Sequence, residues 1–283
     1  MKDKKIITPV QPYLTMEAKD YHERMIRKMG ISSFYEFEVQ DGKNGNFKAV
    51  PDGSTDLVFG IGKKDVKILI GGTVLRAKDW EFEDGRYYFG ARFLPGRSIL
   101  PRSLSVQEIV NTALELDIND YGSGLTDSLA EAENAGERSE ILMRYLSEAQ
   151  GERPRDSVHT LEEYMRQRIY ATGGNISIQM LSRETGYSEA YIRRIFKQIH
   201  GISPKEFERF IRFQAFLQEI SDSPKERGSE EIALNCGYYD QSHMLKDFRI
   251  FADTTPENYK KMLREKREEH KEGKDEEHGI IKD

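Results

Sequence analysis

The sequence has few of the residue types that most enzyme and metal sites need. Its one cysteine, Cys236, excludes an intrachain disulfide and a thiolate zinc cluster. Residues 1–158 contain one histidine, His22, so the His and Glu ligands of a metal-dependent β barrel are missing. Neither a Gly-x-Ser-x-Gly motif nor a glycine-rich phosphate loop is present. We therefore expect no enzyme: no catalytic residue, no metal and no cofactor.

Long apolar runs are missing as well. No stretch is long enough to span a bilayer, and the first residues lack the apolar core of a signal peptide. These absences favour a cytoplasmic protein with no membrane partner. A chain of 283 residues is long enough for two domains that each bury a core.

A pattern that occurs twice between Asn175 and Tyr259 is the most informative feature present. Leu181 and Ile232 are 51 positions apart, as are Gly186 and Gly237. From the second helix of each copy onward the period is 52, because one residue is added in the second turn. A period held across glycine, proline and aromatic positions indicates a structural duplication.

Each copy predicts a helix-turn-helix. A short apolar helix ends at a glycine that can take positive φ, and Ser188 or Asp240 then caps a second helix. The second helices turn Ile192, Phe196, Met244 and Phe248 inward and a polar or basic face outward. Such a face suits the major groove of DNA. The candidate DNA-contacting residues are Glu189, Ala190, Arg193, Arg194, Lys197, Gln241, Ser242, Leu245, Lys246 and Arg249.

These residues resemble the DNA-binding domain of AraC/XylS-type bacterial transcription regulators. The positions that carry the resemblance are Leu181, Gly186-Tyr-Ser188, Ile192, Phe196-Lys197, Gly201-Ile-Ser-Pro204, Ile232-Ala233, Cys236-Gly237-Tyr238, Gln241-Ser242, Phe248 and Thr255-Pro256. The resemblance implies seven helices, with two helix-turn-helix units joined by a long helix that starts at Pro204. It also implies that the two recognition helices enter successive major-groove segments on one face of double-stranded DNA.

Excess positive charge is the one expected feature that is missing. Net charge is −6, and residues 160–265 hold 16 Lys+Arg against 16 Asp+Glu. Phosphate neutralisation needs local positive charge rather than a basic protein. A neutral domain predicts modest non-specific affinity and a larger share for base contacts. The cations we expect to supply the local charge are Arg193, Arg194, Lys197, Arg209, Arg212 and Lys246.

The amino-terminal half predicts an antiparallel sheet or barrel. Short runs at 34–39, 56–61, 66–70 and 86–94 have the texture of strands and are separated by glycine turns, one of them at 41–45. Residues 16–30 are expected to form a helix that stops at Gly30. A second short helix is expected at 106–116.

Two motifs in this half resemble the cupin-like sensor domain of a subset of AraC-type regulators. They are Pro51-Asp52-Gly53 before Asp56-Leu57, and Phe93 before Pro95-Gly96. Both motifs also consist of residues that are common in turns, so they can be explained by turn formation alone. If the barrel has a function, it is binding, with a small-molecule effector at its mouth. We assign no ligand site. Aromatic residues on strands are more often core, and the ones to inspect are Phe59, Trp80, Tyr88 and Phe93.

The expected fold class is therefore α+β, an antiparallel β barrel followed by an all-α double helix-turn-helix domain. The expected parts are a β sensor domain at 1–125, a helical connector and linker at 126–157, the DNA-binding domain at 158–265, and a charged disordered tail at 266–283. The helices before the linker pack on the barrel or pair with a second subunit. The family resemblance favours the homodimer.

Two function classes remain open at this stage. The first is a sequence-specific transcription regulator modulated by an effector or by dimerisation. Its less basic second unit would tune specificity or touch RNA polymerase. The second class is a helix-turn-helix protein-interaction module that has lost DNA binding, and the neutral charge favours it.

Overall fold

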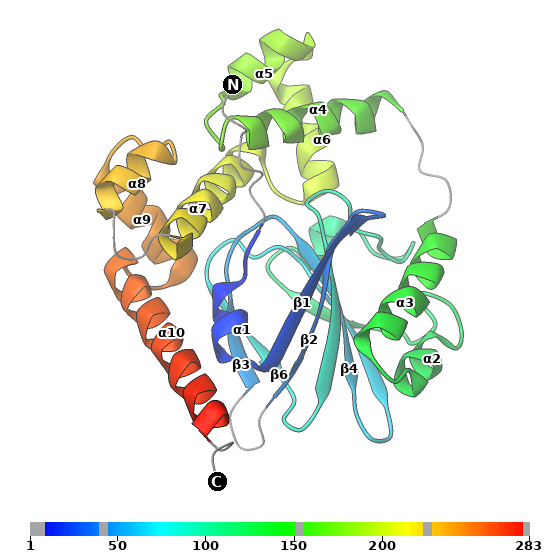
Figure 1. The fold of residues 1–283 in the computed structure, drawn as a ribbon. Coiled ribbons are helices and arrows are strands. Elements are labelled where there is room, and N and C mark those ends of the chain that lie inside the picture. Colours follow the sequence, from blue (N-terminus) through cyan, green and yellow to red (C-terminus); the bar gives the residue numbers. More distant parts are fainter. Residues whose placement is uncertain (1–8, 40–44, 151–155, 223–227, 280–283) are drawn as a thin grey trace.

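The computed structural model describes residues 9–39, 45–150, 156–222 and 228–279. An amino-terminal β domain packs beside a helical carboxy-terminal domain (Figure 1). This arrangement confirms the α+β class and the order of the two halves.

The β domain contains two antiparallel ladders. One has six strands in the order β1-β2-β7-β4-β5-β8, and the other pairs β3 with β6. The strands are β1 (Lys19–Lys28), β2 (Ile31–Glu38), β3 (Gly45–Ala49), β4 (Thr55–Ile61), β5 (Val66–Gly71), β6 (Lys78–Phe82), β7 (Tyr87–Phe93) and β8 (Ala113–Leu116). The four strands predicted from alternation correspond to β2, β4, β5 and β7, and these four are adjacent in the sheet.

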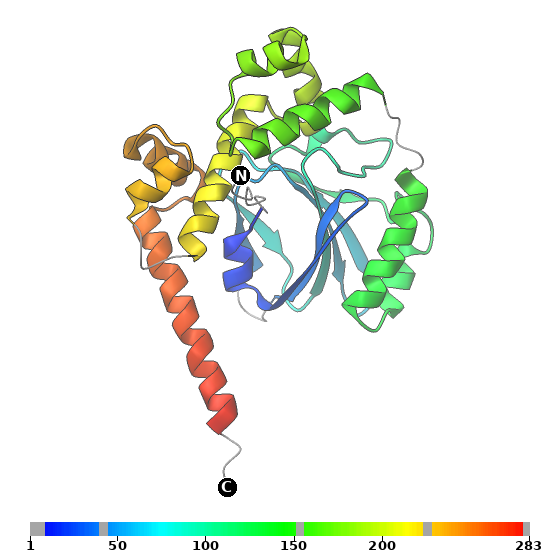
Figure 2. The same cartoon turned by 45° about the horizontal axis from the view of Figure 1, so that its top comes forward.

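Side-chain alternation gives the six-stranded sheet two apolar faces. The inner face carries Tyr35, Phe37, Val58 and Tyr88 against Phe47 of β3. The outer face packs against two helices, α2 (Leu125–Glu131) and α3 (Ala135–Gln150), which contribute buried leucines to the same cluster. Figure 2 shows α2 and α3 on the side of the sheet away from the helical domain.

The helical domain packs around α7, in line with the predicted spacer helix. Its helices are α4 (Ser157–Ala171), α5 (Ile178–Thr185), α6 (Glu189–His200), α7 (Pro204–Asp222), α8 (Ser229–Asn235), α9 (Gln241–Ala252) and α10 (Pro256–Gly279). Phe207, Phe210, Phe213 and Phe216 of α7 are almost fully buried. Helices α4–α6 and α8–α10 lie on either side of α7 (Figure 1).

The helix expected at residues 16–30 is wrong. A short helix, α1 (Pro12–Glu17), precedes β1, which pairs antiparallel with β2. Every residue of β1 is exposed or half-buried, so its own pattern of polar residues carries no strand signal. Pairing with the buried strand β2 determines its conformation.

Two further expectations need correction. Residues 106–116 form a 3-10 helix, η1 (Val106–Ile109), followed by strand β8, because Ala113–Leu116 adds to the edge of β5. The disorder expected from residue 266 is wrong as well, since α10 is helical through Gly279. The charged residues at the end of α10 continue a helix whose first turns pack on the helical core through Tyr259, Met262 and Leu263. The predicted turn at 41–45 and residues 151–155 of the predicted connector and linker fall mainly or wholly outside the described residues.

Candidate nucleic-acid interface

The first helix-turn-helix has the geometry that its sequence predicts. Helix α5 ends at Gly186, whose φ is 75°. Ser188 then accepts a hydrogen bond from the backbone N–H of Tyr191 and caps α6. Ile192, Ile195 and Phe196 are buried, so the opposite face of α6 points outward. This burial confirms the predicted orientation of the helix.

The outward face of α6 is basic but not uniformly so. Ala190, Arg193, Arg194 and Lys197 are exposed, as expected, and Glu189 is half-buried. Glu189 forms an ion pair with Arg193 at 2.8 Å between Oε2 and Nη2. Arg194 forms no such pair with a carboxylate among the described residues; its guanidinium lies 5.0 Å from the ring centroid of Tyr191. Arg194 is therefore the better available cation for a phosphate or a guanine edge.

The second helix-turn-helix repeats the first with one added residue. Gly237 has a φ of 84°, and the Asp240 carboxylate accepts a 2.7 Å hydrogen bond from the His243 N–H. Gln241, Ser242, Lys246 and Arg249 are exposed. The outward position expected for Leu245 is only partly correct, because this side chain is partly buried against the helical core. Less of its side chain is therefore exposed on the outer face of α9.

Two arginines counted among the DNA-facing cations are engaged inside the protein. Arg209 of α7 forms a 2.6 Å ion pair with Asp247 of α9, whose side chain is 1% exposed. Arg212 is buried and donates to the carbonyl of Gly174 at 2.7 Å. The four remaining candidates, Arg193, Arg194, Lys197 and Lys246, are exposed. The positive charge available at the interface is thus smaller than the sequence suggests.

Exposed tyrosines at the turns were missed by the sequence analysis. Tyr187 stacks on Tyr191 with ring centroids 5.0 Å apart, beside Arg194. Tyr239 is 88% exposed and directly precedes the cap residue Asp240. The sequence did contain one signal for Tyr239, because the residue added in the second copy lies in the turn between Gly237 and α9. Aromatic side chains here can pack on a sugar–phosphate backbone.

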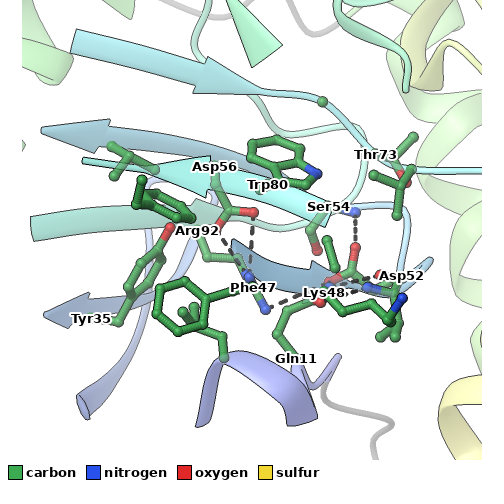
Figure 3. Close-up of a pocket in the computed structure, with 17 residues that line it drawn as sticks. Gln11, Tyr35, Phe47, Lys48, Asp52, Ser54, Asp56, Thr73, Trp80 and Arg92 are labelled. Carbon is green, nitrogen blue, oxygen red and sulfur yellow. Dashed lines mark hydrogen bonds and ion pairs between the residues drawn. The ribbon is translucent and has the colours of Figure 1, made fainter. Parts of the chain in front are cut away.

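The barrel carries its own candidate binding site, on the inner face of the sheet (Figure 3). Of the four aromatics singled out from the sequence, Trp80 lines a pocket there. Phe59, Tyr88 and Phe93 are buried core residues. Asp52 of the first barrel motif also lines the pocket, so this motif does more than form a turn.

Both barrel motifs lie against the helical domain. A Cβ added to Gly53 would lie 2.7 Å from the ring of Phe207 in α7. A Cβ added to Gly96 would lie 2.6 Å from the imidazole of His200 at the end of α6. The sequence had indicated only local turn chemistry for these glycines. These glycines also allow close packing against the helical domain, and that role depends on residues more than a hundred positions away along the chain.

Within the described residues, no helix is long and apolar enough to cross a bilayer. The same part of the chain contains no group of three or more His, Cys, Asp and Glu side chains arranged to hold a metal ion.

Comparison with known proteins supports the assignment of a helix-turn-helix domain. A family model described as a helix-turn-helix domain matches residues 181–262. The regulatory protein SoxS of Salmonella typhimurium is 28% identical over 88 residues, which cover 31% of this chain and 80% of SoxS. SoxS of Escherichia coli K12 is 27% identical over the same length.

Solved structures give a partial overall likeness. An apo variant of ToxT from Vibrio cholerae matches over 85% of this chain and 100% of its own, at a TM-score of 0.43 and 11% identity. A second ToxT crystal form matches over 87% of this chain and 99% of its own, at a TM-score of 0.40 and 12% identity.

The carboxy-terminal fold, the capped recognition helices and the family match define a helix-turn-helix DNA-binding protein. More specifically, residues 181–262 are similar to the DNA-binding domain of AraC-type transcription regulators, and an antiparallel β domain precedes them in the chain.

Proposed function

We propose that this protein is a sequence-specific transcription regulator that places α6 and α9 in two successive major-groove segments. The observation that carries the proposal is the pair of capped helices on either side of α7, each with an exposed polar and basic face. A rigid helix between two such units suits grooves about 34 Å apart on one face of the duplex. Arg194, Lys197 and Lys246 supply phosphate or base contacts, and Gln241 suits adenine.

We further propose that the β domain modulates this DNA binding. The last carbonyls of a helix have no partner within the helix. Here the β domain supplies partners for both recognition helices. Gln107 Nε2 donates to the carbonyls of Lys197 and Gln198 in α6, at 3.1 and 2.9 Å. Any shift of the β domain therefore acts on α6 directly.

Helix α9 is bonded to the β domain in the same way. The backbone N–H of Ala77 donates to the Ile250 carbonyl at 3.0 Å. The Tyr13 hydroxyl donates to the Ala252 carbonyl at 2.6 Å. Because one domain contacts the ends of both recognition helices, its position affects their relative orientation. An effector or a second subunit that moves the β domain would thus alter the fit to DNA.

Dimerisation and contact with RNA polymerase are part of the same proposal. Helix α3 lies on the side of the β domain away from α10, where a second copy can reach it (Figure 2). The second helix-turn-helix offers less positive charge and a fully exposed Tyr239, which suits a role in tuning specificity or meeting the polymerase. A regulator of this type works in the cytoplasm, where the bacterial chromosome lies.

A salt titration tests the DNA-binding proposal. Fluorescence anisotropy would measure the affinity of the full chain for a duplex taken from beside its own gene, and for a scrambled duplex. We expect tighter binding to the native duplex and an affinity that falls linearly with salt on logarithmic axes, with a slope of about −3 to −6 for a few phosphate contacts. Equal and salt-independent signals for both duplexes would instead favour the protein-interaction module.

A further inference from the structure

The last residue of α6, His200, lies where the two domains meet. Its imidazole stacks on Phe196 of the same helix, with ring centroids 4.0 Å apart, and meets Phe207 of α7 at 5.4 Å. The turn that follows β7 covers one edge of the ring, because a Cβ added to Gly96 would lie 2.6 Å from Cε1 and 3.0 Å from Nε2. His200 is 2% exposed. The β domain thus covers an ionisable side chain of the helical domain.

Charged groups from both domains surround this imidazole. Helix α4 contributes Glu162, whose Oε1 lies 3.0 Å from His200 Nε2 and accepts from Arg166 Nε at 2.8 Å. The β domain contributes Arg97, whose Nη2 lies 3.7 Å from Glu162 Oε2 and 3.6 Å from Glu163 Oε2. The fully buried carboxylate of Glu162 is therefore shared by the imidazole and two guanidinium groups.

The hydrogen bonds around His200 suit the neutral imidazole. A carboxylate accepts but does not donate, so Nε2 carries the proton that is shared with Glu162. Nδ1 is buried and has no hydrogen-bond partner among the described residues. A proton on Nδ1 would be a buried donor without an acceptor, and it would add positive charge near Arg97 and Arg166. Burial accordingly lowers the pKa of this imidazole, and the contact with Glu162 offsets the effect only in part.

Separation of the two domains at this point removes both costs. Once the Gly96 turn leaves the ring, water can accept the proton of Nδ1 and screen the added charge. The imidazole then has its ordinary affinity for protons. Because the separated form takes up a proton more readily than the closed form, separation becomes more favourable as pH falls below about 6.5. Above that pH neither form is protonated, and the closed form is kept.

We propose that the contact between His200 and the Gly96 turn is a pH-sensitive latch between α6 and the β domain, closed at neutral pH and opened when the imidazole takes up a proton.

Opening of this latch loosens the other contacts between the β domain and the end of α6. Gln107 donates to two carbonyls there, those of Lys197 and Gln198. Val110 packs against the residue that ends the helix, since a Cβ added to Gly201 would lie 2.4 Å from Val110 Cγ2. All these contacts lie within about one helical turn of the imidazole. An effect of pH on DNA binding rests on the proposed function, whereas the latch itself does not.

Hydrogen–deuterium exchange of the full chain without DNA tests the latch. Exchange is measured by mass spectrometry at several pH values and corrected for the pH dependence of an unstructured peptide. Between pH 7.5 and 5.5 we expect the corrected exchange of residues 94–112 and 197–207 to rise about threefold to tenfold, since opening gains at most tenfold per pH unit. Strand β4, at the centre of the sheet, should change little. An unchanged interface, or an equal rise in β4, would overturn the proposal.

Two histidine variants test the cause of this response. His200→Gln keeps an amide that can donate to Glu162 but takes up no proton in this range, so exchange at the interface should no longer depend on pH. His243→Gln is the matched control, because His243 lies on α9 with its ring 5.6 Å from that of Tyr238, and it should respond like the wild type. The same response in both variants would show that another group titrates, and would overturn the proposal.

Gly96→Ala tests the latch from the side of the β domain and does not depend on the folding of His200→Gln. The added Cβ displaces the turn from the imidazole, so the interface should exchange faster than in the wild type already at neutral pH and respond less to acid. Wild-type exchange in this variant would contradict the proposal.

DNA affinity is measured at neutral pH on the same preparations. A protein that binds its native duplex but shows no pH response at the interface refutes the latch alone. One that shows the pH response but binds no DNA supports the latch and refutes the proposed function alone.

Discussion

At the scale of single residues, the environment of each arginine decides what it can contribute to DNA binding. Four side chains that are equivalent in sequence become different in the fold. Arg209 and Arg212 pair inside the protein, Arg193 pairs with Glu189, and Arg194 rests on a tyrosine ring. A cation that already has a carboxylate partner gains less from a phosphate than one without such a partner.

Replacing Arg194 should therefore weaken specific binding. We expect Arg194→Ala to cost about 1–3 kcal/mol in anisotropy measurements with the native duplex. Arg144→Ala is a matched control, because Arg144 is also exposed and lies 5.5 Å from a tyrosine centroid, but on α3. Equal affinities of the Arg194 and Arg144 variants would mean that α6 does not enter the groove.

A second residue-scale prediction concerns His200 at the end of α6. Burial lowers the pKa of this imidazole below its ordinary value of 6.5, in a site shared with Glu162, Arg166 and Arg97. Because its pKa is lower in the folded protein, the imidazole takes up a proton less readily there than in the unfolded chain as pH falls below about 6.5. The unfolded state then binds more protons, so stability falls as pH falls through this range.

The free energy of unfolding should fall as the pH is lowered from 7.5 to 5.5, measured by urea denaturation. His200→Gln should remove most of this dependence, whereas His243→Gln should keep it. An identical pH slope in the wild-type protein and the His200 variant would show that this histidine does not cause the effect.

At the scale of elements, turns that end strands also form the contact with the helical domain. Gly53 has a φ of 80°, and the Phe207 ring occupies the space that a side chain would need. An alanine at position 53 would be strained at this positive φ, and its Cβ would clash with the Phe207 ring. We therefore expect Gly53→Ala to lower the unfolding free energy by about 1–3 kcal/mol. Gly173→Ala is the control, because its φ is 61° and nothing lies within 4 Å of an added Cβ. Similar losses for the two variants would mean that the Phe207 contact is unimportant.

Elements whose own residues carry a periodic pattern were predictable from the sequence. Both recognition helices, their caps and the buried strands β2, β4, β5 and β7 follow from spacing alone. Strand β1 was missed because its side chains are exposed, and β8 because it is short and adds to an edge. In each case the pairing partner determines the structure.

The candidate site was predictable to a smaller extent. The exposed face of α6 was correct, since amphipathic spacing fixes which residues turn outward. The internal pairs of Arg209 with Asp247 and of Arg212 with Gly174 depend on tertiary contacts that spacing does not encode. The same holds for the pocket, because Asp56 and Arg92 lie on different strands that meet only in the folded sheet.

At the scale of the whole molecule, the β domain and the two helix-turn-helix units form one connected structure. Bonds from the β domain reach α6, α7 and α9, so short paths join the proposed sensing function to the proposed DNA-binding function. The first unit offers more exposed positive charge than the second. We therefore expect Arg194→Ala to reduce DNA affinity more than Lys246→Ala.

Hydroxyl-radical footprinting of the full chain on the DNA beside its own gene tests the central claim most directly. The wild-type protein should protect two patches on one face of the duplex, about one helical turn apart. Arg194→Ala should weaken one patch most and Lys246→Ala the other. A single protected patch, or protection unchanged in both variants, would contradict the placement of α6 and α9 in successive major-groove segments.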